Sequence, residues 1–122
     1  MSPLAHEIYR QLLRHLRAGN PSITYGELAQ KVSKKLRTHQ RSPHFHAALG
    51  ELTVACRANA LPSMPAAVWR ASARRPGEGY YAIAHPRART EEARVAAWER
   101  EHAAVLSAMA RYPVELMRLE RV

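Results

Sequence analysis

Three histidines lie close together in the middle of the chain, at His39, His44 and His46. Histidine commonly binds metals and transfers protons near neutral pH, so this group could form a metal site or the active site of a basic nuclease. Two residues that are two positions apart on a helix point in different directions, however, and no cluster of Cys, Asp or Glu at ligand spacing supports them. We therefore predict histidines on a loop or helix surface and no metal. A nuclease that uses His44 or His46 is the weakest alternative.

Other residue patterns typical of catalysis are missing from the sequence. The chain lacks a Walker-type phosphate loop, a nucleophile elbow and a carboxylate pair with an evident task. Cys56 is the single cysteine, and it falls on the apolar face of an expected helix, where a free cysteine behaves as a small hydrophobic residue. We expect a protein that binds without catalysis and needs no cofactor.

The net charge indicates the kind of partner. The chain has 19 Lys and Arg residues against 10 Asp and Glu residues, and the formal charge of +9 favours polyanions such as nucleic acid. Residues 1–90 hold 14 basic and 4 acidic side chains, whereas residues 91–122 hold 5 basic and 6 acidic ones. The surface that meets a partner should therefore lie in the first three quarters of the chain.

The densest basic run extends from Lys34 to Arg41 and also contains Lys35 and Arg37. It connects the second and third expected helices, which is where helix-turn-helix proteins bring their backbone close to the DNA duplex. Positive charge at this place would neutralise phosphates and release counterions. We predict that these residues, together with Lys31, position the DNA backbone, although a solvated loop is the alternative.

Hydropathy argues against a membrane partner. No apolar run approaches the roughly 20 residues that a membrane span requires. The start of the chain has no charged region followed by an apolar one, so no export signal is visible. We expect a cytoplasmic protein, and a single cysteine agrees with a reducing compartment.

The elements that must position these residues begin with two amphipathic helices. Apolar residues recur every four positions from Leu4 to Leu16, and Gly19-Asn20-Pro21 marks the end of that helix. A second helix should begin after Thr24 and Glu27, which have the spacing of a capping box.

A third helix is predicted from Ser42 to Asn59. Its apolar face is formed by Phe45, Leu49, Leu52 and Cys56. The other side carries mostly small residues together with His46, Thr53 and Arg57, so either DNA or another helix could approach it closely. We predict that these three residues face the major groove.

Two strands are predicted after the third helix, at residues 66–71 and 80–83. The intervening residues 72–79 have the glycines and proline of a hairpin loop, with Arg74 and Arg75 at its tip. These arginines would touch a groove or phosphates, and a solubilising loop is the alternative. A long helix should then follow Thr90 and end at Pro113. The pattern of residues 114–122 fits either a helix or a strand.

These elements predict an α+β fold that is mostly α. We expect a winged helix-turn-helix with a two-stranded wing, an added N-terminal helix and a long C-terminal helix. The length of the chain suits one hydrophobic core, so residues 1–122 should form a single domain with its core at residues 23–84 and a helical extension at residues 90–122.

Residues from Ile23 to Tyr80 resemble the C-terminal DNA-binding domain of alkylguanine-DNA alkyltransferases and the related alkyltransferase-like proteins. Residues 24–29, Thr-Tyr-Gly-Glu-Leu-Ala, are similar to the family's Thr-Tyr-Gly-x-Leu-Ala segment, and residues 48–50, Ala-Leu-Gly, to its Ala-Val-Gly. Asn59, Pro65, Arg70, Ser72, Gly77, Gly79 and Tyr80 look like parts of its later motifs. The resemblance implies DNA binding, with Tyr25 either contacting a phosphate or packing.

The departures from this family concern the chemistry. The family's alkyl-accepting cysteine follows a proline and is activated by the next histidine, whereas Pro65 is followed by Ala66 and Ala67. The family's arginine finger, which takes the place of a flipped base, would align near Ala47. We therefore expect neither alkyl transfer nor base flipping.

We predict a non-catalytic protein of winged-helix type that binds double-stranded DNA. The predicted DNA-binding residues are Tyr25, Lys31, Lys34, Lys35, Arg37, Arg41, His46, Thr53, Arg57, Arg74 and Arg75. The main alternative is a small adaptor, immunity or inhibitor protein that binds another protein through its C-terminal helix, with Trp98, Val105 and Met109 partly exposed. Residues 90–122 could equally form a homodimer interface.

Overall fold

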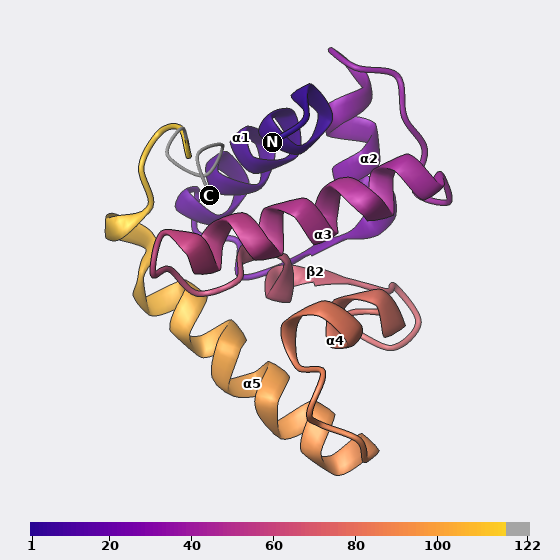
Figure 1. The fold of residues 1–122 in the computed structure, drawn as a ribbon. Helices are drawn as coiled ribbons and strands as arrows, with labels where there is room; N and C mark the ends of the chain where they lie inside the picture. Colours follow the sequence, from indigo (N-terminus) through magenta and orange to yellow (C-terminus); the bar gives the residue numbers. More distant parts are fainter. Residues whose placement is uncertain (117–122) are drawn as a thin grey trace.

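The computed structural model describes residues 1–116, and its N-terminal half consists of three helices (Figure 1). The predicted helices are confirmed as α1 (Pro3–Arg17), α2 (Tyr25–Ser33) and α3 (Pro43–Ala58). Each begins at a side-chain cap, since the hydroxyl groups of Ser2, Thr24 and Ser42 accept hydrogen bonds from backbone N–H groups of the first turn. The capping box of α2 is also present, with Glu27 accepting from the N–H of Thr24.

The sheet differs from the predicted wing. Strand β1 (Ile23–Thr24) pairs with β2 (Val68–Trp69), and the two strands run parallel. Residues 80–83 are not a strand, because they lie inside helix α4 (Glu78–Ala84). Tyr80, Tyr81 and Ala84 share the buried side of this helix, and that burial outweighs the β-propensity of two adjacent tyrosines. The strand predicted at residues 66–71 is confirmed in part, because β2 lies within it, whereas the predicted strand at residues 80–83 and the hairpin wing were wrong.

A tight turn replaces the hairpin loop. The backbone N–H of Arg70 donates to the carbonyl of Arg75 at 2.9 Å, which closes residues 70–75 into a compact turn. Arg74, near its end, has a φ of +54°, in the left-handed region that few residues other than glycine adopt. The turn leads to Gly77, which begins α4.

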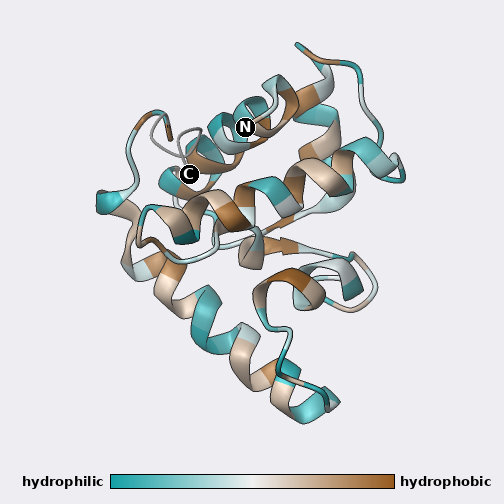
Figure 2. Ribbon diagram, in the orientation of Figure 1, coloured by the Kyte–Doolittle hydropathy of each residue, from teal (hydrophilic) through white to brown (hydrophobic). Residues whose placement is uncertain are grey.

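The hydrophobic core lies between α1, α2, α3 and the 3-10 helix η1 (Met64–Ala67). Ile8 and Leu12 from α1 and Phe45 and Leu52 from α3 belong to this core, and all four side chains are fully buried. Figure 2 shows the corresponding alternation of hydrophobic and hydrophilic residues along α1. Packing of these faces supplies most of the helical stability, because isolated helices of this length are marginal in water.

The long C-terminal helix is confirmed as α5 (Glu91–Ser107), which is followed by the 3-10 helix η2 (Met109–Arg111). Figure 1 shows α5 running below α3 and past α4. Val105 is fully buried, contrary to the partial exposure that a protein interface on this helix predicts, whereas Trp98 and Met109 are half-buried. Residues 117–122, the end of the predicted extension, lie outside the described residues.

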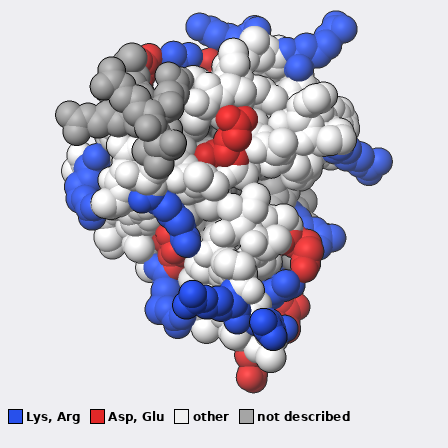
Figure 3. Space-filling model, viewed as in Figure 1, with Lys and Arg blue, Asp and Glu red and all other residues white. Residues whose placement is uncertain are grey.

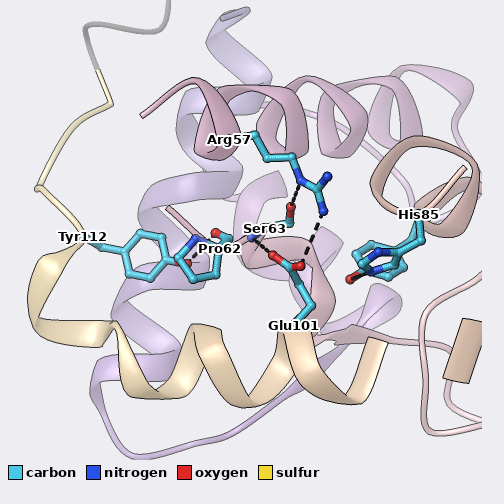
Figure 4. Close-up of polar contacts among 7 residues, drawn as sticks. Arg57, Pro62, Ser63, His85, Glu101 and Tyr112 are labelled. Carbon is cyan, nitrogen blue, oxygen red and sulfur yellow. Dashed lines mark hydrogen bonds and ion pairs between the residues drawn. The ribbon is translucent and has the colours of Figure 1, made fainter. Parts of the chain in front are cut away.

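Polar contacts join α5 to the core (Figure 4). The carboxylate of Glu101 accepts from the buried backbone N–H of Ser63 at 2.6 Å and pairs with Arg57 at 3.4 Å. The hydroxyl of Tyr112 donates to the carbonyl of Pro62 at 2.6 Å. None of the helices in residues 1–116 is both long enough and apolar enough to cross a membrane.

Candidate functional site

The loop between α2 and α3 carries the basic run, and its position is fixed by local contacts. The hydroxyl of Ser33 donates to the carbonyl of Thr38 at 2.7 Å and accepts from the N–H of the same residue at 3.3 Å, which closes the first part of the loop. The imidazole Nε2–H of His46 donates to the carbonyl of Gln40 at 2.6 Å and holds the second part against α3. A loop held in this way presents its charges from a defined place.

Gln40 reaches from this loop to the start of α2. Its side-chain oxygen lies 2.3 Å from where a Cβ of residue 26 would be, so a side chain at that position would collide with it. Glycine at position 26 therefore permits this approach, and a larger residue there would displace the Gln40 side chain. The contact brings the basic loop over the N-terminal end of α2.

Tyr25 joins the loop side of the site to the turn after β2. Its hydroxyl oxygen accepts a hydrogen bond from the backbone N–H of Gly77 at 2.9 Å, and its ring lies 5.5 Å from the ring of His46. Burial raises the pKa of the Tyr25 phenol, so the hydroxyl keeps its proton at neutral pH. The predicted packing role of Tyr25 is thus present in the structure.

A cavity of about 730 Å³ opens between these segments. Its walls come from the start of α2, the end of the basic loop, the first three turns of α3, Pro65, residues 70–72 and α4. Four of the sequence-predicted residues line it, namely Tyr25, Arg41, His46 and Thr53. A cavity of this size is in the range of small-molecule and cofactor sites.

The basic residues of the loop are exposed and available. Lys34, Lys35, Arg37 and Arg41 are exposed, and Lys31 is half-buried on α2. None of these five side chains forms an ion pair or hydrogen bond within residues 1–116. Their charges are therefore free to meet an external anion.

Two of the predicted contacts are used inside the protein. Thr53 is buried, and its hydroxyl donates to the carbonyl of Leu49, so it cannot face a groove as predicted. The guanidinium of Arg57 is held by Ser63 and Glu101 rather than extended from α3. Thr53 is therefore unavailable to DNA, and Arg57 would have to give up its contacts with Ser63 and Glu101 to reach a groove.

The turn after β2 keeps only part of its predicted role. Arg74 is exposed and has no ion pair among the described residues, whereas Arg75 pairs with Glu91 at 2.8 Å. Arg70 was not among the predicted contacts, yet it is exposed, lines the cavity and lies against Gly77. Arg70 and Arg74 can thus contact a ligand, whereas Arg75 can do so only by giving up its ion pair with Glu91.

The positive charge is not gathered on one flank. In Figure 3 basic side chains lie along the upper and right edges, near α2 and the basic loop, on the left side, and again at the bottom, near the loop that follows α4. The middle of this face, over α3, is mostly uncharged. Glu51 on α3 is exposed and accepts from the N–H and hydroxyl of Ser2 at 3.0 and 2.8 Å. A polyanion would therefore meet the edge of this face and not its centre.

Cys56 and the alkyltransferase-like position do not form a nucleophilic site. Cys56 is fully buried on α3, and burial raises the pKa of its thiol to about 12. The residue after Pro65 is Ala66, which is buried in the core. A thiolate is the reactive form of cysteine, so Cys56 stays inert at neutral pH.

Two of the three clustered histidines have local structural partners. The Nδ1 of His39 accepts from the backbone N–H of Arg41 at 3.1 Å, and His46 is bound to Gln40. His44 is exposed at the start of α3. No group of three or more His, Cys, Asp and Glu side chains within residues 1–116 is arranged to hold a metal ion.

Several residues of the site were not singled out in the sequence. Gln40 is an uncharged residue within a basic run, Gly50 and Ile83 are apolar, and Arg70 follows a strand. Ile83 reaches the cavity because α4 places its side chain across α3, with its Cδ1 only 2.7 Å from where a Cβ of residue 50 would be. Of these residues, only Gly50 and Arg70 could have been found from the sequence, because both belong to the motifs that resemble the alkyltransferase family.

Comparison of the chain with protein-family models, with curated proteins and with solved structures gives no match in any of the three. The candidate function is therefore argued from the residues and their geometry.

Proposed function

We propose that this protein binds double-stranded DNA without catalysis. The basic loop between α2 and α3, the first turn of α3 and Arg74 would contact the duplex along the edge of the cavity. The observation that carries this proposal is the set of five unpaired cations from Lys31 to Arg41, in a stretch where residues 28–50 contain no Asp or Glu. Cations of this kind bind phosphates and release counterions.

The placement of the acidic residues supports the same proposal. Glu7, Glu78, Glu91 and Glu101 each pair with an arginine, and Glu27 and Glu51 accept hydrogen bonds at helix starts. These carboxylates are used within the fold, which leaves the loop cations uncompensated. The resemblance of residues 23–80 to an alkyltransferase DNA-binding domain agrees with this proposal.

The test is a fluorescence polarisation titration of a short DNA duplex at several salt concentrations. We expect an association constant that falls steeply with salt, because each neutralised phosphate contributes about −0.9 to the slope of log K against log salt. Replacing Lys34, Lys35 and Arg37 by Glu should abolish binding. A chain that does not bind duplex DNA even at low salt would overturn the proposal.

The matched control changes the same amount of charge elsewhere. Arg14, Arg87 and Arg89 are exposed, and within residues 1–116 their side chains form no ion pair. Replacing these three by Glu gives the same net charge as the loop variant. If the proposal is correct, the control keeps most of its DNA affinity, whereas equal losses in both variants would show that net charge alone attracts DNA.

A protein partner at the C-terminal end is the second candidate. Leu106 on α5 and Val114 after it are 38% and 74% exposed. Against this, Trp98 donates its indole N–H to the carbonyl of Ala66 at 2.8 Å and Val105 is buried, so the larger apolar groups of α5 already pack within the fold. If the partner is a second copy of the chain, replacing Leu106 by Glu should lower the molar mass measured in solution from that of a dimer to that of a monomer. If it is another protein, the variant in which Lys34, Lys35 and Arg37 are replaced by Glu should still bind that partner.

A further inference from the structure

The cavity beside the basic loop has an apolar wall that DNA backbone contacts do not require. Leu49, Pro65 and Ile83 line it, from α3, η1 and α4. Ile83 is 43% exposed, so its aliphatic side chain presents an accessible apolar surface. Apolar lining with a few placed polar groups is typical of sites for small molecules.

The charge at the mouth of the cavity is positive. Arg41 and Arg70 line it and form no ion pair within residues 1–116. One carboxylate also lines it, that of Glu78, but both of its oxygens lie 2.8 Å from the guanidinium of Arg94. Since this carboxylate is neutralised from outside the cavity, the mouth attracts anions.

Among the polar groups of the cavity, the hydroxyl of Tyr25 and the guanidinium groups of Arg41 and Arg70 have hydrogen-bond donors to spare. The Tyr25 oxygen accepts from Gly77, and among the described residues nothing accepts the proton of its own hydroxyl. The Thr53 hydroxyl already donates to Leu49, and Nε2–H of His46 donates to Gln40. A bound group that accepts hydrogen bonds would therefore complete the site, with Tyr25 as the neutral donor.

We propose that the cavity binds a small organic anion with an apolar body. Its carboxylate or phosphate group would lie between Tyr25 and Arg70, where a charge-assisted hydrogen bond is strong. Its apolar part would pack on Leu49, Pro65 and Ile83. This inference goes beyond DNA binding and does not depend on it, although Arg41 serves both surfaces and so couples them.

The backbone amides of the glycines can report binding, because four of the five glycines line the cavity. Gly26, Gly50, Gly77 and Gly79 line it, whereas Gly19 ends α1 and nothing lies within 4 Å of its Cβ position. In ¹⁵N–¹H spectra of the full chain, titration with benzoate or phenyl phosphate should move the first four amide signals in a saturable way and leave that of Gly19 unmoved. Benzamide has the same apolar body without the charge, and it should bind at least about tenfold more weakly.

Two variants localise the binding. Arg70→Gln should weaken benzoate and phenyl phosphate about tenfold and leave benzamide unchanged, and Ile83→Trp should fill the apolar side and abolish all three. Arg87→Gln, an exposed arginine outside the cavity, is the control and should bind as the parent does. Comparing the affinities of benzoate and phenyl phosphate shows whether the site prefers a carboxylate or a phosphate group.

The inference is overturned if the four signals do not saturate, if Gly19 moves with them, or if benzamide binds as tightly as benzoate. Duplex DNA is titrated in the same samples. If the chain binds the small anions but not duplex DNA, the proposed function is refuted and this inference stands. If it binds duplex DNA but not the small anions, this inference is refuted and the proposed function stands.

Discussion

The phenol oxygen of Tyr25 accepts a hydrogen bond at 2.9 Å from the backbone N–H of Gly77, 52 positions later in the chain. This contact ties the start of α2 to the turn that replaces the predicted hairpin. It fixes the width of the cavity, because Tyr25 and Gly77 stand on two of its walls. The relationship explains why a tyrosine is useful here even without a direct role toward DNA.

Replacing Tyr25 by Phe should lower the free energy of unfolding by about 1 kcal/mol, since the half-buried N–H of Gly77 loses its acceptor. Tyr81 provides the control, because its hydroxyl is buried and has no hydrogen-bond partner in residues 1–116. Tyr81→Phe removes an unsatisfied polar group and should be neutral or slightly stabilising. Urea denaturation of both variants measures the difference, and equal losses would contradict the assignment.

Glu101 should be the most sensitive carboxylate of the fold. Glu101→Ala leaves the buried N–H of Ser63 without an acceptor and Arg57 without its partner, which should cost about 2–3 kcal/mol of unfolding free energy. Glu101→Gln keeps an accepting oxygen and should cost less. Glu99, two positions earlier and exposed, is the control, and Glu99→Ala should stay within about 0.5 kcal/mol of the parent in urea denaturation. A large loss of unfolding free energy in the Glu99 variant would show that the effect comes from changes to α5 in general and not from the contact with Ser63.

Local chemistry made the helices predictable. The caps at Ser2, Thr24 and Ser42 and the apolar spacing of α1 and α3 are all encoded within a few residues of each other, and the structure places helix starts where they indicate. The presence of Cys56 on a buried face followed from the same spacing. These features need no knowledge of the rest of the fold.

Contacts between distant segments were beyond the reach of such reasoning. The Arg57–Glu101 pair joins residues 44 positions apart, so spacing could not show that Arg57 is engaged. Residues 80–83 have the composition of a strand, but packing against α3 makes them helical. Thr53 lies four positions after Leu49 and therefore beside the apolar face, a signal that was present in the sequence and outweighed by the expectation of a DNA-facing helix.

The stability of the protein should fall in alkaline solution through Cys56. Burial raises the pKa of its thiol to about 12, whereas in the unfolded chain the thiol loses its proton near pH 8.5 to 9. Above that pH the native state binds more protons than the unfolded state, so the free energy of unfolding falls as pH rises, by up to about 1.4 kcal/mol per pH unit. This contribution is fully present below about pH 8.5 and is lost progressively up to about pH 12.

Urea denaturation between pH 8 and pH 9 measures this slope, in a window where tyrosines in the unfolded chain are still largely protonated. Cys56→Ala should be less stable at every pH because of the cavity it leaves, but its stability should change less between these two pH values. Parallel curves for the parent and the variant would show that another group titrates.

The contact between Gly26 and Gln40 predicts a coupled pair of substitutions. Gly26→Ala places a methyl group where the Gln40 amide lies, so the amide must leave and the basic loop loses its anchor on α2. In the background of Gln40→Ala the space is free, and the same substitution should be neutral or stabilising because alanine favours a helix. The double-mutant cycle in urea should therefore show a coupling on the order of 1 kcal/mol, and strictly additive effects would mean that Gln40 does not occupy this place in solution.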